Sequence, residues 1–267
     1  MDEQTQKPLT AQQVGTRDMR QQGWANRVTS ELFPGLVVHK GMKVVDIGCG
    51  NGGYTMFCAR RGAEVTFIDR QENHVRELED KLSKEDGIVF HGMVSDCDPI
   101  PLPDGYADLV ICTEVLEHVR DPEIMLSELA RIARYGASLL LTVPDSRGEN
   151  LIKEVVAPDY FQEPNHIRIF TAEEFEALVC RHGLEVVRHD YRGAFWAIFY
   201  LFKWVTSEPG EVLNEDVHPI TKLWTRTWSE VLDHPDGSKI VENLNRALPQ
   251  SQIILARKKP LADQSQN

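Results

Sequence analysis

The sequence predicts an α/β fold built on a doubly wound, mostly parallel sheet. Short apolar runs rich in β-branched residues alternate with segments of helical spacing along much of the 267 residues. The first apolar run, 44–47, leads directly into a string of glycines and then into a helical pattern that ends near Gly62. A strand, a glycine loop and a helix in this order form the first half of a nucleotide-binding crossover.

The remaining elements follow from periodicity and end signals. Trp24, Val28 and Leu32 recur one turn apart, which predicts an N-terminal helix from about residue 10 to 33. Thr171 and Glu174 form a capping box at the start of a later helix. In order along the chain, helices are expected at 71–82, 121–133 and 171–183, and strands at 64–69, 88–94, 107–112, 137–143 and 184–191.

The glycine loop leaves two kinds of ligand to be weighed. Its sequence, Gly48-Cys49-Gly50-Asn51-Gly52-Gly53, satisfies G-x-G-x-x-G and so allows a dinucleotide pyrophosphate at the helix N-terminus. Asp46 precedes the first glycine by two residues, so its carboxylate is expected to face the ligand. A carboxylate beside a pyrophosphate is costly, whereas beside an ammonium or sulfonium group it is favourable.

Acidic residues also follow the next two strands. Asp69 ends the strand 64–69, about twenty residues after the glycines, where a carboxylate can accept both hydroxyls of a ribose. Asp96 follows the strand 88–94 at the edge where open α/β sheets bind ligands, and Asp98 is the alternative to it. The strand 107–112 runs into T-E-V-L-E-H-V, so four strand ends with polar groups converge on one crevice.

These motifs, in this order and spacing, resemble class I S-adenosylmethionine-dependent methyltransferases. The resemblance is carried by V-V-D-I-G-C-G-N-G, F-I-D, S-D-C-D and A-D-L-V-I-C-T-E-V-L-E-H-V, and it covers roughly residues 42–191. It is strongest to the branch that acts on small molecules, including quinone-biosynthesis enzymes. The resemblance implies a Rossmann-like, seven-stranded sheet whose last strand is residues 253–257.

The same resemblance implies a set of cofactor-binding residues for S-adenosyl-L-methionine. The loop glycines would lie against the methionine moiety, Asp46 would serve its amino group directly or through water, Asp69 the ribose, and Asp96 with Cys97 the adenine. An N-terminal helix would cover the cofactor, with Trp24 either in contact or simply anchoring the helix. The complete expected set is Asp46, Gly48, Cys49, Gly50, Gly52, Asp69, Arg70, Asp96, Cys97 and Thr113.

Two segments stand outside the regular alternation and are expected to shape the acceptor site. The first, 145–169, contains His166, which together with His118 is a candidate general base for an acceptor hydroxyl. The second, 193–237, is rich in aromatic residues and holds four of the five tryptophans. It forms either a lid over an apolar or aromatic acceptor, involving Trp196 and Trp204, or only a small core of its own.

Composition restricts the partners. A formal charge of −12, from 29 basic and 41 acidic residues, disfavours nonspecific binding to nucleic acid. The longest apolar run, 194–202, is too short to span a membrane, and the N-terminus has no apolar stretch of the kind found in signal peptides. Five cysteines without a C-x-x-C pair suggest neither a disulfide framework nor a metal site, so a cytoplasmic location is expected.

The sequence therefore predicts a methyltransferase that acts on a small molecule at oxygen, nitrogen or carbon by in-line displacement. A nicotinamide-dependent oxidoreductase that uses the same glycine loop is the alternative, and a non-catalytic S-adenosylmethionine-binding protein is another. The sequence does not indicate an oligomeric state. We expect one domain with a helical cap at 10–40, a core at 41–192, an insertion at 193–237, and a closing helix and strand at 238–260.

Overall fold

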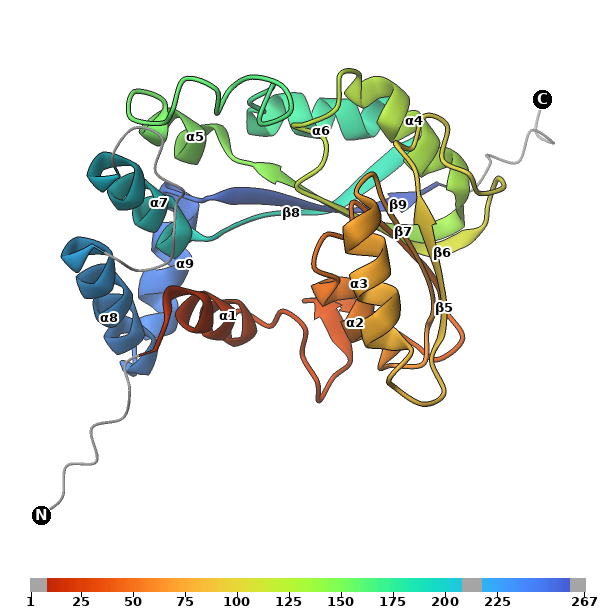
Figure 1. Ribbon diagram of the computed structural model, residues 1–267, viewed down its shortest axis with the longest axis horizontal. Helices are drawn as coiled ribbons and strands as arrows, with labels where there is room; N and C mark the ends of the chain where they lie inside the picture. Colours follow the sequence, from red (N-terminus) through yellow and green to blue (C-terminus); the bar gives the residue numbers. More distant parts are fainter. Residues whose placement is uncertain (1–8, 208–217, 260–267) are drawn as a thin grey trace, which may run out of the picture.

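The computed structural model describes residues 9–207 and 218–259. Its centre is a seven-stranded sheet in the order β5-β4-β3-β6-β7-β9-β8, in which only the pairs of β9 with β7 and β8 are antiparallel (Figure 1). The predicted seven-stranded Rossmann-like sheet is confirmed. The strands are β3 (Lys43–Ile47), β4 (Glu64–Asp69), β5 (Val89–Val94), β6 (Ala107–Thr113), β7 (Ala133–Pro144), β8 (Leu184–Arg192) and β9 (Ser251–Lys258).

Helices cover both faces of this sheet. Apolar side chains of α2 (Gly53–Ala59) and α3 (Glu72–Leu82) pack on one face, and those of α4 (Pro122–Ile132) and α6 (Ala172–Arg181) pack on the other. Thr171 caps α6 through the predicted capping box with Glu174. Asp121 accepts hydrogen bonds from two backbone N–H groups at the start of α4. These caps satisfy donors that the first turn of a helix leaves unpaired.

The predicted N-terminal helix is correct only in its first half. Helix α1 (Ala11–Gln21) is followed by turns and by a small antiparallel sheet of β1 (Glu31–Phe33) and β2 (Leu36–Val37). Trp24 is buried against Phe33, whereas Val28 is 93% exposed, so the two do not share one apolar helix face. The spacing of the apolar residues continues past Gln21, and this spacing predicted a longer helix. The backbone nevertheless leaves the helical conformation at Ala25 and Ser30, both of which have positive φ.

The aromatic-rich insertion is helical where it is described. Helices α7 (Ala194–Thr206) and α8 (Pro219–Asp233) pack together with α9 (Gly237–Ala247) and α1, at one end of the sheet (Figure 1). Residues 208–217 of the predicted insertion, and residue 260 of the predicted closing segment, lie outside the described residues. Within the described ranges, no helix combines the length and the apolar character that crossing a bilayer requires.

The four tryptophans of the insertion divide into two pairs. Trp228 is 1% exposed and donates from Nε1 to Asp18 of α1 at 3.2 Å, and Trp224 donates to the carbonyl of Phe195 at 2.9 Å. This pair belongs to the small helical core. Trp196 and Trp204 instead line a cavity beside the sheet. Trp196 also packs against the helical core through Phe195 and Phe199, so both roles considered for the insertion stay open.

Candidate active site

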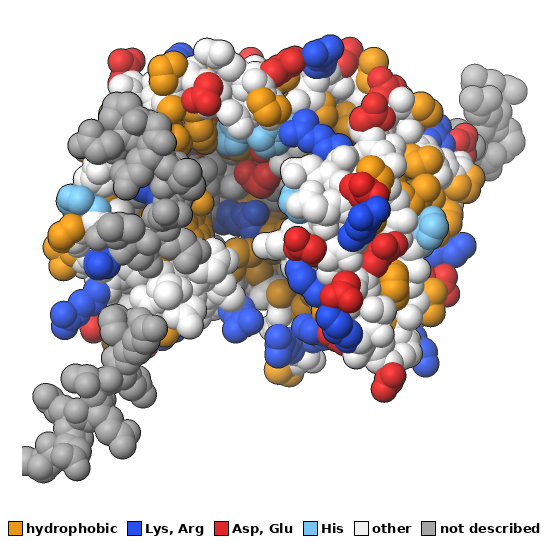
Figure 2. Space-filling model, in the orientation of Figure 1, with side chains coloured by type: hydrophobic (Ala, Val, Ile, Leu, Met, Phe, Trp, Pro, Cys, Tyr) orange, Lys and Arg blue, Asp and Glu red, His pale blue; other side chains and the backbone are white. Residues whose placement is uncertain are grey.

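Two neighbouring cavities lie at the carboxyl ends of the parallel strands. The larger has a volume of about 840 Å³ and borders the ends of β3, β4, β5 and β6, and we call it the donor cavity. The smaller, of about 500 Å³, lies toward α1, α5 and α7, and we call it the acceptor cavity. Glu114 lines both. The visible face of the molecule is hollowed at its centre, with acidic, basic and histidine side chains inside (Figure 2).

The backbone of the glycine loop is already hydrogen-bonded within the protein. The N–H groups of Gly48 and Cys49 both donate to the carbonyl of Ile68, at 2.8 and 3.2 Å. The N–H of Gly50 donates to Asp69 Oδ2 at 3.0 Å. A phosphate chain at such a loop needs N–H groups that are free to donate. Because these three are in use, the loop is poorly suited to a pyrophosphate.

The loop glycines serve different purposes. Gly48 lines the donor cavity, and a Cβ added there would lie 2.4 Å from Val115 Cγ2. Gly50 has a φ of +50°, and the nearest heavy atom to a Cβ added there would be the Gly48 carbonyl oxygen at 4.0 Å. At Gly52 an added Cβ would lie 2.3 Å from Leu78 Cδ1 of α3. The missing side chain of Gly52 thus makes room for α3, and its predicted contact with the cofactor stays a prediction.

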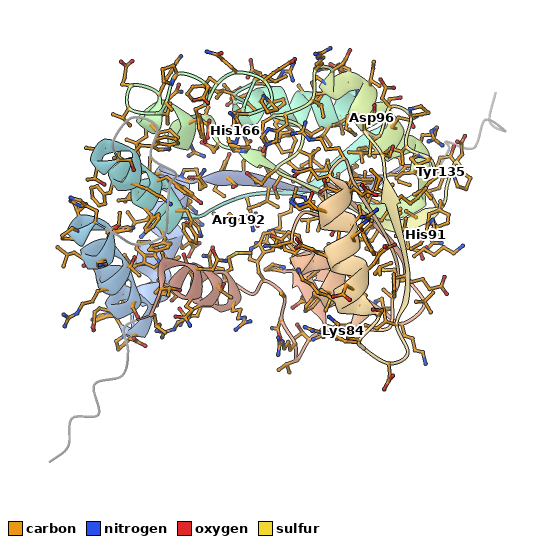
Figure 3. All side chains as sticks on the ribbon, in the orientation of Figure 1. Lys84, His91, Asp96, Tyr135, His166 and Arg192 are labelled. Carbon is orange, nitrogen blue, oxygen red and sulfur yellow. The ribbon has the colours of Figure 1, made fainter. Side chains whose placement is uncertain are left out.

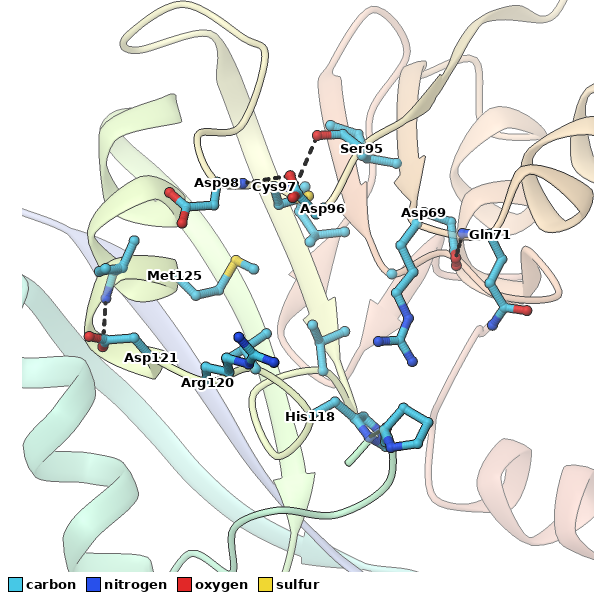
Figure 4. Close-up of a pocket in the computed structure, with 18 of the residues that line it drawn as sticks. Asp69, Gln71, Ser95, Asp96, Cys97, Asp98, His118, Arg120, Asp121 and Met125 are labelled. Carbon is cyan, nitrogen blue, oxygen red and sulfur yellow. Dashed lines mark hydrogen bonds between the residues drawn. The ribbon is translucent and has the colours of Figure 1, made fainter. Parts of the chain in front are cut away.

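Asp69 is held in a fixed orientation at the wall of the donor cavity. Its Oδ2 accepts from Gly50, and its Oδ1 accepts from the N–H of Gln71 at 2.8 Å. Two ionised carboxylate oxygens offer about four lone pairs, so capacity remains for hydroxyl donors. Asp96 and Asp98 both line the cavity from the segment after β5, and the alternative between them stays open (Figure 4). These groups fit the sugar and the base of a nucleoside.

Asp46 precedes the glycine loop in sequence and lines neither the donor nor the acceptor cavity. Its side chain is almost fully buried, and its Oδ2 accepts a hydrogen bond from Thr55 Oγ1 of α2 at 2.5 Å. Burial, only partly offset by this hydrogen bond, raises the pKa of Asp46 to about 7. The prediction placed the carboxylate by sequence distance from the glycines. In the structure its carboxylate bonds to Thr55 of α2, and its predicted role at the methionine amino group, directly or through water, stays a prediction.

The remaining expected cofactor residues divide into two groups. Gly48, Asp69, Arg70, Asp96 and Cys97 line the donor cavity. The other five line neither cavity, and their contact with a cofactor stays a prediction: Asp46, Cys49, Gly50, Gly52 and Thr113. Gly50 nevertheless acts on the site, because its N–H orients Asp69.

A histidine–glutamate pair lies at the acceptor cavity. His166 lines the cavity, and its Nδ1 lies 3.1 Å from Oε2 of Glu149, a fully buried residue of α5 (Ser146–Ile152). The hydroxyl of Tyr160 donates to the other carboxylate oxygen at 3.3 Å. In the tautomer whose Nδ1 donates to Glu149, Nε2 of His166 is left to accept a proton. This pair can therefore take a proton from an acceptor hydroxyl.

His118 lines the donor cavity and also holds a covering segment in place. Its Nδ1 lies 2.9 Å from the carbonyl oxygen of Asn165 and 3.2 Å from that of Pro164 (Figure 4). Burial lowers the pKa of His118. Because Nδ1 donates to these carbonyl oxygens, the ring fixes residues 164–165 at the cavity. This geometry favours a positioning role for His118 over a catalytic one.

Glu117 adds a buried carboxyl group between the two histidines. Neither of its carboxylate oxygens has a hydrogen-bond partner among the described residues, and burial raises its pKa well above the usual range. One ligand atom from each of Glu117, His118 and His166 lies within 4.8 Å of the others. Two imidazoles and a carboxylate are ligands that transition metals accept, so these residues could hold a divalent ion. No local spacing signals this cluster in the sequence.

Several residues of the two cavities were missed by the sequence analysis. Glu114 has a positive φ of 54°, which is unusual for a residue with a side chain, and its Oε1 accepts from Thr142 Oγ1 at 2.7 Å. Arg192 reaches the acceptor cavity from β8. Figure 3 places Arg192 and His166 toward the same end of the sheet, away from Asp96. Glu114 was visible as an acid after a strand, but Glu149 and Arg192 carried no signal.

Comparisons with known proteins agree with this geometry. A family model described as a methyltransferase domain matches residues 18–189. The ubiquinone biosynthesis O-methyltransferase of Aeromonas salmonicida is 29% identical over 151 residues, which are 54% of this chain and 61% of that protein. The enzyme of the same name from Dechloromonas aromatica is 26% identical over 188 residues, covering 69% of this chain and 72% of the other. The chain thus spans about three fifths of the first of these relatives.

Solved structures support the fold. The geranyl diphosphate C-methyltransferase of Streptomyces coelicolor A3(2) superposes with a TM-score of 0.55 at 16% identity, over 82% of this chain and 75% of that one. A match at this identity concerns the architecture of the sheet and helices, not the identity of the ligands.

Proposed function

The chain belongs to the methyltransferase domain family, and from this premise we propose that it transfers the methyl group of S-adenosyl-L-methionine to a hydroxyl group of a small molecule. The hydroxyl acceptor is favoured by the His166–Glu149 pair and by the O-methyltransferase names of the curated relatives. The alternative of a nicotinamide-dependent oxidoreductase is disfavoured, because the loop N–H groups that would bind a pyrophosphate are already used.

The observation that carries the proposal is the arrangement of the donor cavity. Gly48 gives a wall without a side chain, Asp69 offers a fixed carboxylate for the ribose, and the segment of Asp96 and Cys97 borders the adenine end. Burial raises the pKa of the Cys97 thiol to about 12, so this side chain stays uncharged. S-adenosyl-L-methionine supplies a sulfonium-activated methyl group when it is bound.

The residues of the chain have three tasks in this reaction. They must hold donor and acceptor in line, and such positioning can lower the barrier by several kcal/mol. They must take up the proton of the acceptor hydroxyl, which we assign to His166 with Glu149 orienting its ring. They must also limit water, and Tyr160, Trp196 and Trp204 form an aromatic wall around the acceptor cavity for this purpose.

The aromatic wall also favours a class of acceptor. Tyr160 and Trp204 meet edge to face with ring centroids 5.7 Å apart, and Trp196 stacks on Tyr200 at the same distance. Rings arranged in this way offer flat apolar surfaces to a bound ring or chain. We therefore expect an acceptor with an apolar or aromatic body.

Calorimetry followed by a turnover assay tests the proposal. The purified protein should bind S-adenosylhomocysteine and should not bind NAD or NADP under the same conditions. Supplied with S-adenosyl-L-methionine and a panel of phenols and catechols, it should release S-adenosylhomocysteine together with a methyl ether detectable by mass spectrometry. Binding of a nicotinamide dinucleotide without binding of S-adenosylhomocysteine would contradict the proposal.

A further inference from the structure

Arg192 is placed where it can recognise a charge on the acceptor. It ends β8 and lines the acceptor cavity, and its side chain is only 13% exposed. Among the described residues around this cavity, it is the one lysine or arginine. A guanidinium group withdrawn from water is unfavourable unless its donors find partners.

Most of these donors remain available to a ligand. Nη1 of Arg192 donates to the hydroxyl of Tyr54 at 3.0 Å. Nη2 lies 4.0 Å from Glu114 Oε1, which is too far for a hydrogen bond. The guanidinium also lies 4.3 Å from the centroid of the Trp24 ring, so its position is fixed by stacking. The Arg192 guanidinium is thus held in one orientation, while most of its N–H donors have no hydrogen-bond partner among the described residues.

The start of α7 adds positive potential at the same cavity. Its N-cap, Gly193, lines the cavity in a left-handed conformation and has no side chain to cap the helix, although the N–H of Ala194 donates to Asn245 Oδ1 of α9 at 2.9 Å. The N-terminus of an α-helix carries roughly half of a positive charge. Two positive groups, from β8 and from α7, therefore border the acceptor cavity.

We propose that Arg192, assisted by the N-terminus of α7, binds a carboxylate carried by the methyl acceptor. The inference rests on the proposed function and adds the charge of the substrate to it. A planar guanidinium matches a carboxylate with two parallel hydrogen bonds, which gives orientation as well as attraction. With the aromatic wall beside it, the cavity is suited to an aromatic or otherwise apolar acid.

The geometry assigns this carboxylate to the acceptor rather than to the methyl donor. Arg192 does not line the donor cavity, which is formed by the ends of β3, β4, β5 and β6. Strands β7 and β9 separate β8 from β6 in the sheet. Two acids line the same cavity, and each carboxylate has donors of its own: Glu114 accepts from Thr142, and Asp18 accepts from Trp228 and Gln22. Glu114 lies 4.0 Å from Arg192 Nη2, beyond hydrogen-bond distance.

A pair of matched probes tests this assignment. Benzoate and benzyl alcohol have similar size but differ in charge, and their binding can be measured by calorimetry with S-adenosylhomocysteine present at saturation. The variants are Arg192→Met, Arg192→Lys and, as a control, Arg188→Met. Arg188 lies on the same strand and pairs with Asp190 outside the acceptor cavity.

The native protein should bind benzoate at least about tenfold more tightly than benzyl alcohol, as expected for a charge-assisted pair. Arg192→Met should abolish this preference, Arg192→Lys should keep part of it, and Arg188→Met should leave it unchanged. Affinity for S-adenosylhomocysteine should be the same in all four proteins.

Three results would overturn the inference. The first is equal binding of the two probes by the native protein, and the second is a preference for benzoate that survives in Arg192→Met. The third is a loss of S-adenosylhomocysteine binding in Arg192→Met, because this loss would mean that the guanidinium binds the methyl donor. Should Arg192→Met fail to fold, Arg192→Lys decides, because an undiminished preference there contradicts recognition by the guanidinium fork. A native protein that does not bind S-adenosylhomocysteine would instead contradict the proposed function.

Discussion

At the scale of single residues, His166 bears most of the chemistry proposed here. Replacing His166 with alanine removes the group that takes up the acceptor proton, so kcat should fall by about 10² to 10⁴ with unchanged affinity for S-adenosylhomocysteine. His182→Ala is a matched control, because it breaks a histidine–glutamate pair with Glu123 that lies outside both cavities. Steady-state kinetics with an identified acceptor would check this, and native turnover in His166→Ala would remove the residue from the mechanism.

Glu149 should act through His166 rather than on the acceptor. Glu149→Gln keeps an oxygen that can accept from Nδ1 but removes the negative charge that stabilises a protonated imidazole. We expect kcat to decrease by less than in His166→Ala. The acidic limb of its pH profile should move to lower pH, because without the negative charge of Glu149 the imidazolium form of His166 is less stable.

 A profile identical to that of the native protein would show that Glu149 has only a structural role.

Asp46 should make the stability of the protein depend on pH. Its folded-state pKa of about 7 lies above the usual value of 3.8, so the folded state holds this proton more tightly than the unfolded state does. Its contribution is fully present below about pH 4 and is lost as the pH rises to about 7. Asp18, whose pKa burial raises to about 6, acts in the same direction.

The variant Asp46→Asn isolates this effect. Asparagine keeps an oxygen that can accept from Thr55 but cannot ionise, so the free energy of unfolding should fall less between pH 5 and pH 8 than in the native protein. Urea unfolding at the two pH values measures both slopes. Equal slopes in the two proteins would show that Asp46 is ionised at neutral pH in the folded state.

The sequence predicted the position of site residues that directly follow a strand of the parallel sheet. It did not predict site residues that other parts of the fold bring to the cavities. Asp69 and Asp96 follow strands of a parallel sheet, whose ends meet at one edge, so their place in the donor cavity followed from the sequence. Arg192 lines the acceptor cavity from β8, and Glu149 of α5 acts on it through His166, and no local pattern relates these two residues to each other. Asp46 has the spacing expected of a ligand-facing acid, and the sequence did not indicate its buried hydrogen bond with Thr55.

At the scale of elements, the contact between the glycine loop and α3 can be tested at Gly52. An alanine there would require a φ of +79° and would place Cβ 2.3 Å from Leu78, so we expect a loss of about 1–3 kcal/mol in the free energy of unfolding. Gly53→Ala is the control, since its added Cβ would lie 3.6 Å from the nearest atom, which is ordinary contact. Chemical denaturation of both variants provides the measurement, and equal stability would contradict the packing argument.

The strands of the sheet and the helices that cover it were predictable, because the spacing of their apolar residues agrees with the residues that mark their ends. Glu64–Asp69 is a strand with the predicted ends, and Asp121 and Thr171 cap helices as their sequence context indicates. The N-terminal segment failed because its spacing of Trp24, Val28 and Leu32 imitates a helix, whereas positive φ angles within it depend on tertiary contacts.

At the scale of the whole molecule, the insertion joins the N-terminal helix into one structure beside the sheet. Trp228→Ala removes a side chain that is 1% exposed and hydrogen-bonded to Asp18, so it should lower the free energy of unfolding by about 3–5 kcal/mol.

Trp196→Ala, at the cavity wall, should mainly raise the KM for the acceptor and leave S-adenosylhomocysteine binding unchanged. Thermal unfolding and kinetics of the two variants separate these effects, and a collapse of cofactor binding in Trp196→Ala would contradict a role at the acceptor.

The meeting of the two cavities at Glu114 has a consequence for inhibitor design. A single compound with an adenosine at one end and an aromatic acid at the other could occupy both, with its linker passing that glutamate. Because the second half would then bind as part of an already tethered molecule, its effective concentration would be high, and the affinity should exceed that of either fragment by orders of magnitude.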